Sequence, residues 1–137
     1  MDDRISALRA VPLFSELSDR DLKRVLEIAK EVVHTDGQPV VEEDASAAGF
    51  HLILGGEATV SVRGSEVGTF RAGDYFGEMS IIDGKPRSAS VRARGELKTL
   101  GIPSWNFERL MDQHPSVMRA LLVELSRRIR SIEAQRS

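Results

Sequence analysis

Residues 73–92 read GDYFGEMSIIDGKPRSASVR, and this stretch decides how the rest of the chain is interpreted. It joins an Asp-marked turn to an FGE triplet and then to a PRSASV segment. Gly77 can adopt backbone angles that other residues avoid, which lets the main chain come close to a ligand. Residues 78–82 can form one helical turn, whose free N–H groups favour a phosphate. The stretch therefore predicts a small-anion site against a strand edge.

Two charged residues of this stretch indicate different parts of a ligand. Arg87 carries a permanent positive charge in a planar group that can donate hydrogen bonds to two phosphate oxygens. A carboxylate beside a phosphate is unfavourable unless each has its own donors, so Glu78 is predicted to accept a hydrogen bond from a hydroxyl. A ribose 2′-hydroxyl fits that role.

The segment FGEMSIIDGKPRSASV resembles the phosphate-binding cassette of the cyclic nucleotide-binding domain family. That family includes the regulatory subunits of cyclic AMP-dependent kinase, the catabolite activator protein and nucleotide-gated channels. The resemblance implies that Gly77 and Glu78 bind the ribose and phosphate side of the ligand. It also implies that backbone N–H groups near Met79 and Ser80 cap the cyclic phosphate and that Arg87 neutralises it.

The resemblance also bears on the choice of base. Ser88 and Ala89 follow Arg87 and complete the implied ligand-binding set. Family members selective for cyclic GMP more often carry Thr at the Ser88 position, while Ser also occurs in cyclic AMP binders. We therefore expect cyclic AMP, with cyclic GMP as the alternative, and no other cofactor. Arg128 and Ile132 are candidates for the residue that covers the purine, by position only.

Composition limits the class of protein. The chain has 137 residues and a formal net charge of −2, so no overall field favours nucleic acid or an acidic membrane. Cysteine is absent, which excludes disulfides, thiolate nucleophiles and Cys-ligated metals. The start, MDDRISALRA, does not resemble a signal peptide, and apolar runs are far shorter than the roughly 20 residues that span a bilayer. We expect a cytoplasmic protein of one domain.

The periodicity of apolar residues predicts a mainly β fold with flanking helices. Residues 2–10 favour a helix, Pro12 interrupts it, and Ser18 is a good N-cap for a second helix to about Lys30. Beyond it, period-two patterns predict strands at 31–35, 39–42, 50–54, 57–63 and 66–70, with tight turns at Gly55-Gly56 and Gly64-Ser65. Short strands separated by glycine turns favour a β-roll, also called a double-stranded β-helix or jelly roll.

The roll is predicted to close after the cassette. Further strands are expected at 89–93 and 97–102, and Pro103 ends the sheet. Ser104 is predicted to cap a helix that stops near His114, and Pro115 to begin a last helix towards Ser137. The expected organisation is one domain, 1–137, with N-terminal helices (1–30), the roll (31–103) and C-terminal helices (104–137), and with no helix-turn-helix or catalytic domain.

The last helix carries apolar residues at alternating spacings of four and three: Met118, Leu122, Leu125, Ile129 and Ile132. This spacing is a coiled-coil seam of about two heptads. Either this face packs back on the roll, or it pairs with a second copy in a homodimer, as the resemblance to the catabolite activator protein implies. Both can hold in part, because Val117 and Leu121 widen the apolar face beyond a single seam. The arginines of the outer face are expected to be solvated near the helix C-terminus rather than to bind nucleic acid.

An enzymatic function would need ligands or nucleophiles that the sequence does not group. A cupin-like metalloenzyme needs clustered histidines, whereas His34, His51 and His114 are far apart and are expected to be surface or hydrogen-bonded residues. No GxSxG motif is present. We therefore expect a non-catalytic sensor whose C-terminal helix moves when nucleotide binds and signals to an effector protein. The alternatives are a ligand-free β-roll interaction module and, less favoured, a cupin-like enzyme.

Overall fold

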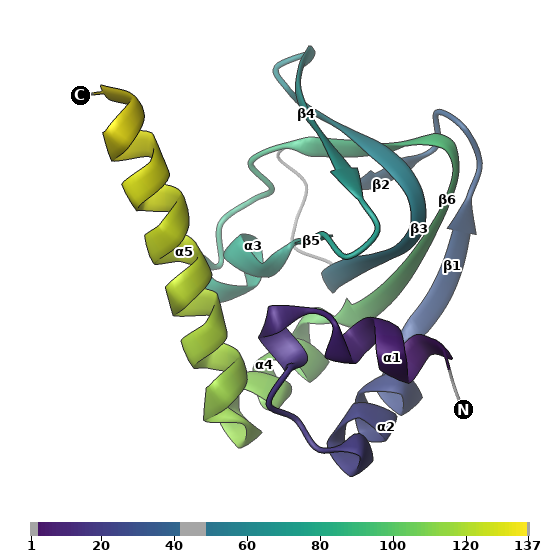
Figure 1. Ribbon diagram of the computed structural model, residues 1–137. Helices are drawn as coiled ribbons and strands as arrows, with labels where there is room; N and C mark the ends of the chain where they lie inside the picture. The colour runs from purple at the N-terminus through teal and green to yellow at the C-terminus, as the bar shows by residue number, and fades with distance from the viewer. Residues whose placement is uncertain (1–2, 42–48, 137) are drawn as a thin grey trace.

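Two long antiparallel strands, β3 (Gly49–Val62) and β6 (Ser90–Pro103), form the centre of the fold (Figure 1). The structure is a computed structural model and describes residues 3–41 and 49–136. Two predicted boundaries lie outside these residues: the end of the second strand at Glu42 and the end of the last helix at Ser137. The other elements are α1 (Asp3–Arg9), η1 (Pro12–Phe14), α2 (Asp19–Ile28), β1 (Lys30–His34), β2 (Pro39–Val41), β4 (Ser65–Arg71), β5 (Tyr75–Phe76), α3 (Glu78–Asp83), α4 (Ser104–Gln113) and α5 (Pro115–Arg136).

Both central strands change partners along their length, and this closes the roll. The first half of β3 pairs with β5 and the second half with β4. Likewise, β6 pairs first with β2 and then with β1. Every pairing is antiparallel. The predicted β-roll with flanking helices and a long C-terminal helix is confirmed.

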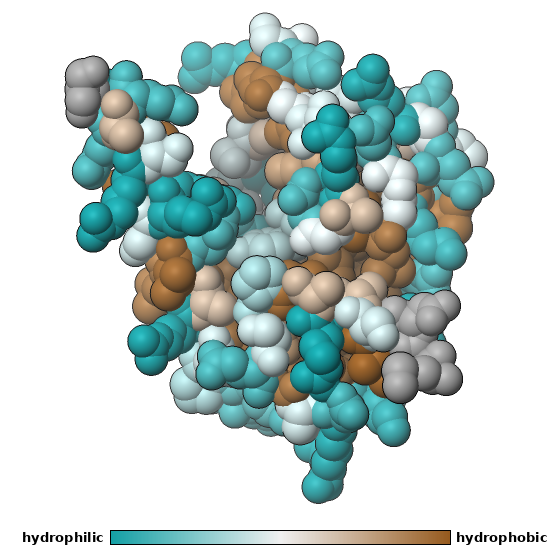
Figure 2. Space-filling model, in the orientation of Figure 1, coloured by the Kyte–Doolittle hydropathy of each residue, from teal (hydrophilic) through white to brown (hydrophobic). Residues whose placement is uncertain are grey.

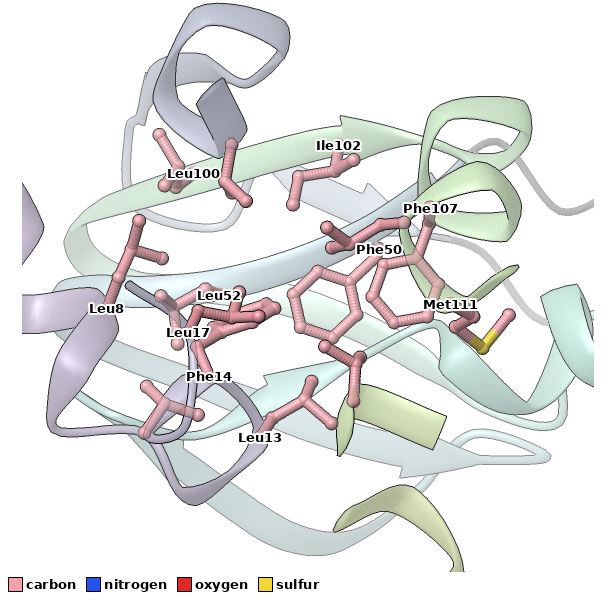
Figure 3. Packing of buried hydrophobic residues seen from close by; sticks show 14 of the residues in the cluster. Leu8, Leu13, Phe14, Leu17, Phe50, Leu52, Leu100, Ile102, Phe107 and Met111 are labelled. Carbon is pink, nitrogen blue, oxygen red and sulfur yellow. The ribbon is translucent and has the colours of Figure 1, made fainter. Parts of the chain in front are cut away.

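In Figure 1, helices α1, α2 and α4 lie together below the roll, and α5 rises along one side of it. Helix α2 begins as predicted, because the Ser18 hydroxyl accepts a hydrogen bond from the backbone N–H of Asp21 at 3.2 Å. The apolar core between the helices and the sheet centres on Phe50 of β3, whose ring stacks on Phe107 of α4 at 4.5 Å (Figure 3). Phe14 of η1 meets the same ring edge-on at 6.0 Å. A smaller core, including Ile53, Phe76 and Val91, fills the interior of the roll.

The predicted hairpin at Gly55-Gly56 is wrong, because β3 continues through both glycines. The strand is bulged there: the register against β6 shifts between Ile53 and Gly55 and again between Gly55 and Glu57. Gly56 has φ +88°, the angle that had indicated a turn. The two strands predicted at 89–93 and 97–102 are likewise one strand, β6, which passes through Gly95 at φ +73°.

Two other boundaries differ from the prediction by one residue. The turn between β3 and β4 is formed by Arg63 and Gly64, both with positive φ, and Ser65 already belongs to β4. Such a pair is the two-residue hairpin loop that suits the twist of the strands. Pro103 ends β6 as predicted, but Ser104 is the first residue of α4, and Pro103 holds the N-cap position.

Helix α5 packs on the rest of the molecule through Val117 and Leu121, which are buried, and its N-terminal half lies against η1. The predicted seam is elsewhere: Met118, Leu122, Ile129 and Ile132 are each at least 41% exposed. The interpretation that this face packs back on the rest of the molecule is thus correct for Val117 and Leu121, which widen it, but not for these four seam residues; Leu125 is half-buried. Among the described residues, no helix has the length and apolarity that a membrane crossing requires.

The bulge in β3 gives a test with a matched control. A Cβ at Gly56 would collide with the backbone oxygen of Glu96 and lie 3.1 Å from the Cα of Leu97, and its φ is left-handed. At Gly55 nothing lies within 4 Å of an added Cβ. We expect Gly56→Ala to lower the free energy of unfolding by about 1 to 3 kcal/mol, and Gly55→Ala to change it by less than about 0.5 kcal/mol. Urea denaturation measures both, and equal effects would contradict the bulge.

Candidate functional site

The residues predicted for the ligand site lie around one cavity of about 160 Å³. The seven predicted residues are Gly77, Glu78, Met79, Ser80, Arg87, Ser88 and Ala89, and all of them line it. Glu78, Ser80 and Arg87 are buried, whereas Met79 and Ser88 are exposed. The cavity walls are completed by apolar residues of the roll and by Arg128 of α5. We call this cavity the cassette pocket.

Gly77 connects β5 to α3 and can only be glycine. Its φ is +98°, and it holds the N-cap position of α3, so that Glu78 is the first helical residue. A Cβ there would collide with the backbone oxygen of Gly49 and lie 2.6 Å from Nη1 of Arg87. The missing side chain therefore lets the guanidinium of Arg87 pack directly against the start of the helix.

Arg87 is buried with half of its guanidinium uncompensated. The residue is 5% exposed, and its Nη2 donates a hydrogen bond to the backbone oxygen of Gly49 at 2.8 Å. Nη1 is buried and has no hydrogen-bond partner among the described residues. Burial lowers the pKa of Arg87, while the nearby Glu78 carboxylate raises it. A buried cationic donor without a partner is costly, so the site is organised for an anion.

Glu78 is buried at the same cavity and contacts the C-terminal helix. Its Oε1 lies 3.5 Å from Nη1 of Arg128, a long ion pair, and its Oε2 has no hydrogen-bond partner among the described residues. Burial raises the pKa of Glu78, and the charge of Arg128 acts against that shift. An ionised carboxylate with one free oxygen is an acceptor for a hydroxyl.

Arg128 links the site to a chain of charges along α5. Its Nε donates to Oε1 of Glu124 at 3.2 Å, and Glu124 also accepts two hydrogen bonds from Arg127. The hydrogen bond from Arg127 lowers the pKa of Glu124. Sequence reasoning considered Arg128 only as a residue above the purine, because nothing in the arginine-rich face distinguishes it from its neighbours.

A second and larger cavity of about 410 Å³ adjoins the cassette pocket, between η1 and α5. The two cavities share Phe70, Tyr75 and Arg128 as lining residues. Burial, with a smaller effect of Glu78, raises the pKa of Tyr75 to about 12, so its hydroxyl keeps its proton. Figure 2 shows a hollow between the C-terminal half of α5 and the roll.

The histidines do not gather into a metal site. No group of three or more possible protein ligands occurs in the described parts of the chain. His34 is buried, and its Nε2 lies 3.1 Å from the Thr99 hydroxyl, as expected for a hydrogen-bonded residue. His114 ends α4. His51 fits neither expected role: it stacks on Phe76 at 5.1 Å, and neither ring nitrogen has a hydrogen-bond partner within residues 3–41 and 49–136.

Comparison with known proteins identifies the family. The sequence matches the cyclic nucleotide-binding domain over residues 31–114, and the chain belongs to that family. It is 33% identical over 114 residues to the cAMP-dependent protein kinase regulatory subunit of Emericella nidulans, which covers 82% of this chain and 28% of the relative. The chain thus spans less than a third of the length of the curated relatives it matches.

Solved structures agree with this assignment. The regulatory domain of Toxoplasma gondii PKA, co-crystallised with cAMP, has a TM-score of 0.79 and 28% identity, covering 91% of this chain and 49% of that one. The catabolite activator protein of Thermus thermophilus has a TM-score of 0.80 at 24% identity, covering 90% of this chain and 61% of that one, which is a likeness in fold. The predicted resemblance to both groups is confirmed.

The raised pKa of Glu78 gives a pH-dependent prediction. Because the folded state holds the Glu78 proton more tightly than the unfolded state, ionisation of Glu78 costs stability as the pH rises through its folded pKa. We expect Glu78→Gln, which is always neutral, to raise the Tm of the ligand-free protein at pH 7. The advantage should disappear below about pH 4.5, where Glu78 is protonated in both states.

The control for this prediction has the opposite sign. Because hydrogen bonding lowers the pKa of Glu124, its ionised form stabilises the fold at neutral pH. Glu124→Gln should therefore not raise the Tm at pH 7. Thermal unfolding of the two variants and the wild type between pH 4 and pH 7 checks both, and a destabilised Glu78→Gln protein at pH 7 would refute the assignment.

Proposed function

We propose that this chain is a non-catalytic cyclic nucleotide-binding regulatory domain that prefers cyclic AMP. One observation carries the proposal: Arg87 and Glu78 line the same small cavity, and Nη1 of the first and Oε2 of the second are buried without a partner among the described residues. The unpaired cationic donor of Arg87 suits a cyclic phosphate, and the unpaired acceptor oxygen of Glu78 suits a ribose 2′-hydroxyl.

Each predicted residue has a role in this complex. Arg87 binds the phosphate, which supplies the partner that Nη1 lacks. The backbone N–H groups at the start of α3, from Gly77 to Ser80, cap the phosphate oxygens, and Met79 presents one of them. Glu78 accepts a hydrogen bond from the 2′-hydroxyl. Ser88 and Ala89 line the pocket beside the phosphate.

The base lies outside the cassette pocket in this proposal. A cavity of about 160 Å³ is smaller than the about 300 to 1,000 Å³ that small-molecule sites usually occupy. It accommodates the ribose and phosphate, and the purine extends towards Tyr75, Phe70 and Arg128, where the larger cavity begins. Helix α5 borders that space and repositions over the purine.

Arg128 gives nucleotide binding a route to α5. A hydroxyl that donates to the free Oε2 of Glu78 supplies part of the hydrogen bonding that this buried carboxylate lacks, so the carboxylate depends less on the 3.5 Å contact between its Oε1 and Arg128, and the hold of this contact on α5 weakens. The nucleotide can move the helix only to the extent that it binds one helix position more tightly than the other. In this proposal an effector protein senses the movement of α5.

Removal of Arg87 tests the anion site. We expect Arg87→Ala to weaken cyclic AMP binding by about 2 to 4 kcal/mol, or about 30- to 1,000-fold, because a charge-assisted hydrogen bond is lost from a buried site. Arg94→Ala, which removes the same charge from an exposed position of β6, should keep wild-type affinity. Titration calorimetry with cyclic AMP, cyclic GMP and 5′-AMP measures affinity and base preference.

The outcome of this titration is decisive. The purified wild type must first be freed of nucleotide, and circular dichroism must show that the variants are folded. If folded, nucleotide-free wild type binds neither cyclic nucleotide, the sensor function is wrong. Arg87→Lys refines the result: it keeps the charge but loses the planar pair of donors, so its affinity should lie between those of wild type and Arg87→Ala.

A second candidate function is a homodimer that forms through α5, with or without nucleotide. The seam residues Met118, Leu122, Ile129 and Ile132 favour it, because they repeat with heptad spacing on a 22-residue helix and are 41% to 61% exposed. Figure 2 shows apolar surface over the middle of α5. A second copy with the same seam would bury this surface.

Charged substitutions in the seam test dimerisation. We expect the wild type to sediment as a dimer and the double variant Leu122→Lys, Ile129→Lys to sediment as a monomer, because buried unpaired charges oppose association. A control pair, Ser131→Lys with Ala134→Lys, adds the same charge at exposed positions outside the seam and should remain dimeric. A wild type that is monomeric at every concentration examined by sedimentation equilibrium would exclude the dimer.

A further inference from the structure

A cavity of about 250 Å³ lies between β1, β2, β3 and β6 and shares no lining residue with the cassette pocket. Its walls include Val32, His34, Val40, His51, Thr99 and Gly101. We call it the β1–β6 pocket. For scale, an engineered apolar cavity of about 150 Å³ binds benzene, so this pocket has room for a substituted single ring or a short branched chain.

Gly101 keeps the pocket open. A Cβ at Gly101 would lie 3.6 Å from Nδ1 of His51 and 3.7 Å from the backbone oxygen of Lys30, both ordinary contacts. A larger side chain at this position would therefore extend into space that glycine leaves empty. Glycine weakens a strand compared with a β-branched residue, so the space is maintained at some cost to stability.

The two histidines that line this pocket have buried ring nitrogens without partners among the described residues. His34 is 8% exposed, and its Nδ1 has no hydrogen-bond partner among the described residues. Both ring nitrogens of His51 are likewise buried and without a partner in residues 3–41 and 49–136. Each such atom costs about 1 to 3 kcal/mol. Native proteins rarely leave several unsatisfied polar atoms together, so two histidines with three such nitrogens in the walls of one cavity indicate a position for a polar group.

The chemistry of these nitrogens limits the ligand. Burial lowers the pKa of both histidines, that of His51 to about 4, so both rings are neutral at physiological pH. A neutral imidazole offers one N–H donor and one acceptor nitrogen, and a hydroxyl can bond to both kinds of group. The remaining walls are mostly apolar. A cation would be repelled by Arg87, whose charge reaches His51.

The β1–β6 pocket is connected to the candidate anion site through β3. Gly49, which lines the pocket, accepts the hydrogen bond from Nη2 of Arg87 at 2.8 Å. His51 stacks on Phe76, and Phe76 lines the cassette pocket. A molecule that contacts Gly49 and His51 therefore contacts the support of Arg87.

We propose that the β1–β6 pocket binds a small uncharged molecule with an apolar body and one hydroxyl group, of the phenol or alcohol class, between His34 and His51. We further infer that its occupancy changes nucleotide affinity through Gly49 and Arg87. This second part rests on the proposed nucleotide-binding function, whereas the first does not.

The first part is tested by nitrogen-15 NMR of the histidine side chains in the whole chain. We expect p-cresol to shift the ring resonances of His34 and His51 saturably, and toluene, which lacks the hydroxyl, to bind about fivefold more weakly because about 1 kcal/mol of hydrogen bonding is lost. Gly101→Val should abolish the shifts, since it fills the pocket. Gly68→Val, with nothing within 4 Å of its added Cβ, should leave them unchanged.

Three results would overturn the binding site: no saturable shift in the wild type, an undiminished shift in folded Gly101→Val, or equal affinity for toluene. If Gly101→Val does not fold, Gly101→Ala serves instead and should weaken binding without abolishing it. Benzyl alcohol and cyclohexanol in the same titration distinguish a phenol from an alcohol ligand.

The second part is tested by calorimetric titration of cyclic AMP with and without saturating p-cresol. We expect the Kd for cyclic AMP to change at least about fivefold, with a reciprocal change in p-cresol affinity. An unchanged Kd would overturn the coupling and leave the pocket established. If no cyclic nucleotide binds at all, the proposed function fails, and the histidine shifts still decide whether the pocket binds its ligand.

Discussion

The burial of the Arg87 guanidinium determines how the candidate ligand site is built. Arg87 is fixed by a backbone oxygen, that of Gly49, rather than by a carboxylate. This arrangement needs glycine at two positions: a Cβ on Gly49 would lie 2.6 Å from the oxygen of Ile102, and one on Gly77 would lie 2.6 Å from the guanidinium itself. Nη1 of Arg87 stays without a hydrogen-bond partner among the described residues, so the charge of this buried group is compensated only in part, by the nearby Glu78 carboxylate.

Patterns among neighbouring residues predicted most of the helices and strands. The prediction failed where the same residues can form either of two structures. The N-cap at Ser18 and the helix start at Pro115 need only neighbouring residues to be recognised. Gly55-Gly56 was interpreted as a hairpin because glycine at positive φ makes tight turns. The same angle also makes a bulge, and the choice depends on β6, about 40 residues away, whose Glu96 and Leu97 approach Gly56. A single sequence does not contain that partner information.

The difference between local patterns and long-range contacts also explains which residues of the candidate site were predicted. Its seven predicted residues belong to one contiguous stretch, so their order along the chain already indicates that they lie together, and the cavity gathers all of them. Arg128 is separated from Glu78 by 50 residues. The spacing of apolar residues in α5 predicts the seam, but it does not predict that Arg128 contacts Glu78. His34 and His51 come from different strands, and only the roll places both at one pocket. Contacts between distant elements were therefore the part that sequence could not supply.

The position of α5 and the charge of Glu78 depend on each other. Burial disfavours the ionised carboxylate, and Arg128 is its only hydrogen-bonding cation in the described chain, so α5 lies against the roll partly to hold that charge. A hydroxyl that donates to the free Oε2 of Glu78 stabilises the same carboxylate by a hydrogen bond that does not come from the helix. On the proposed function, nucleotide binding therefore weakens the attachment of α5 to the roll. By linkage, a partner protein that draws α5 away from the roll destabilises the nucleotide-free site relative to the occupied one, and so raises the affinity for nucleotide. The helix need not touch the phosphate to respond to it.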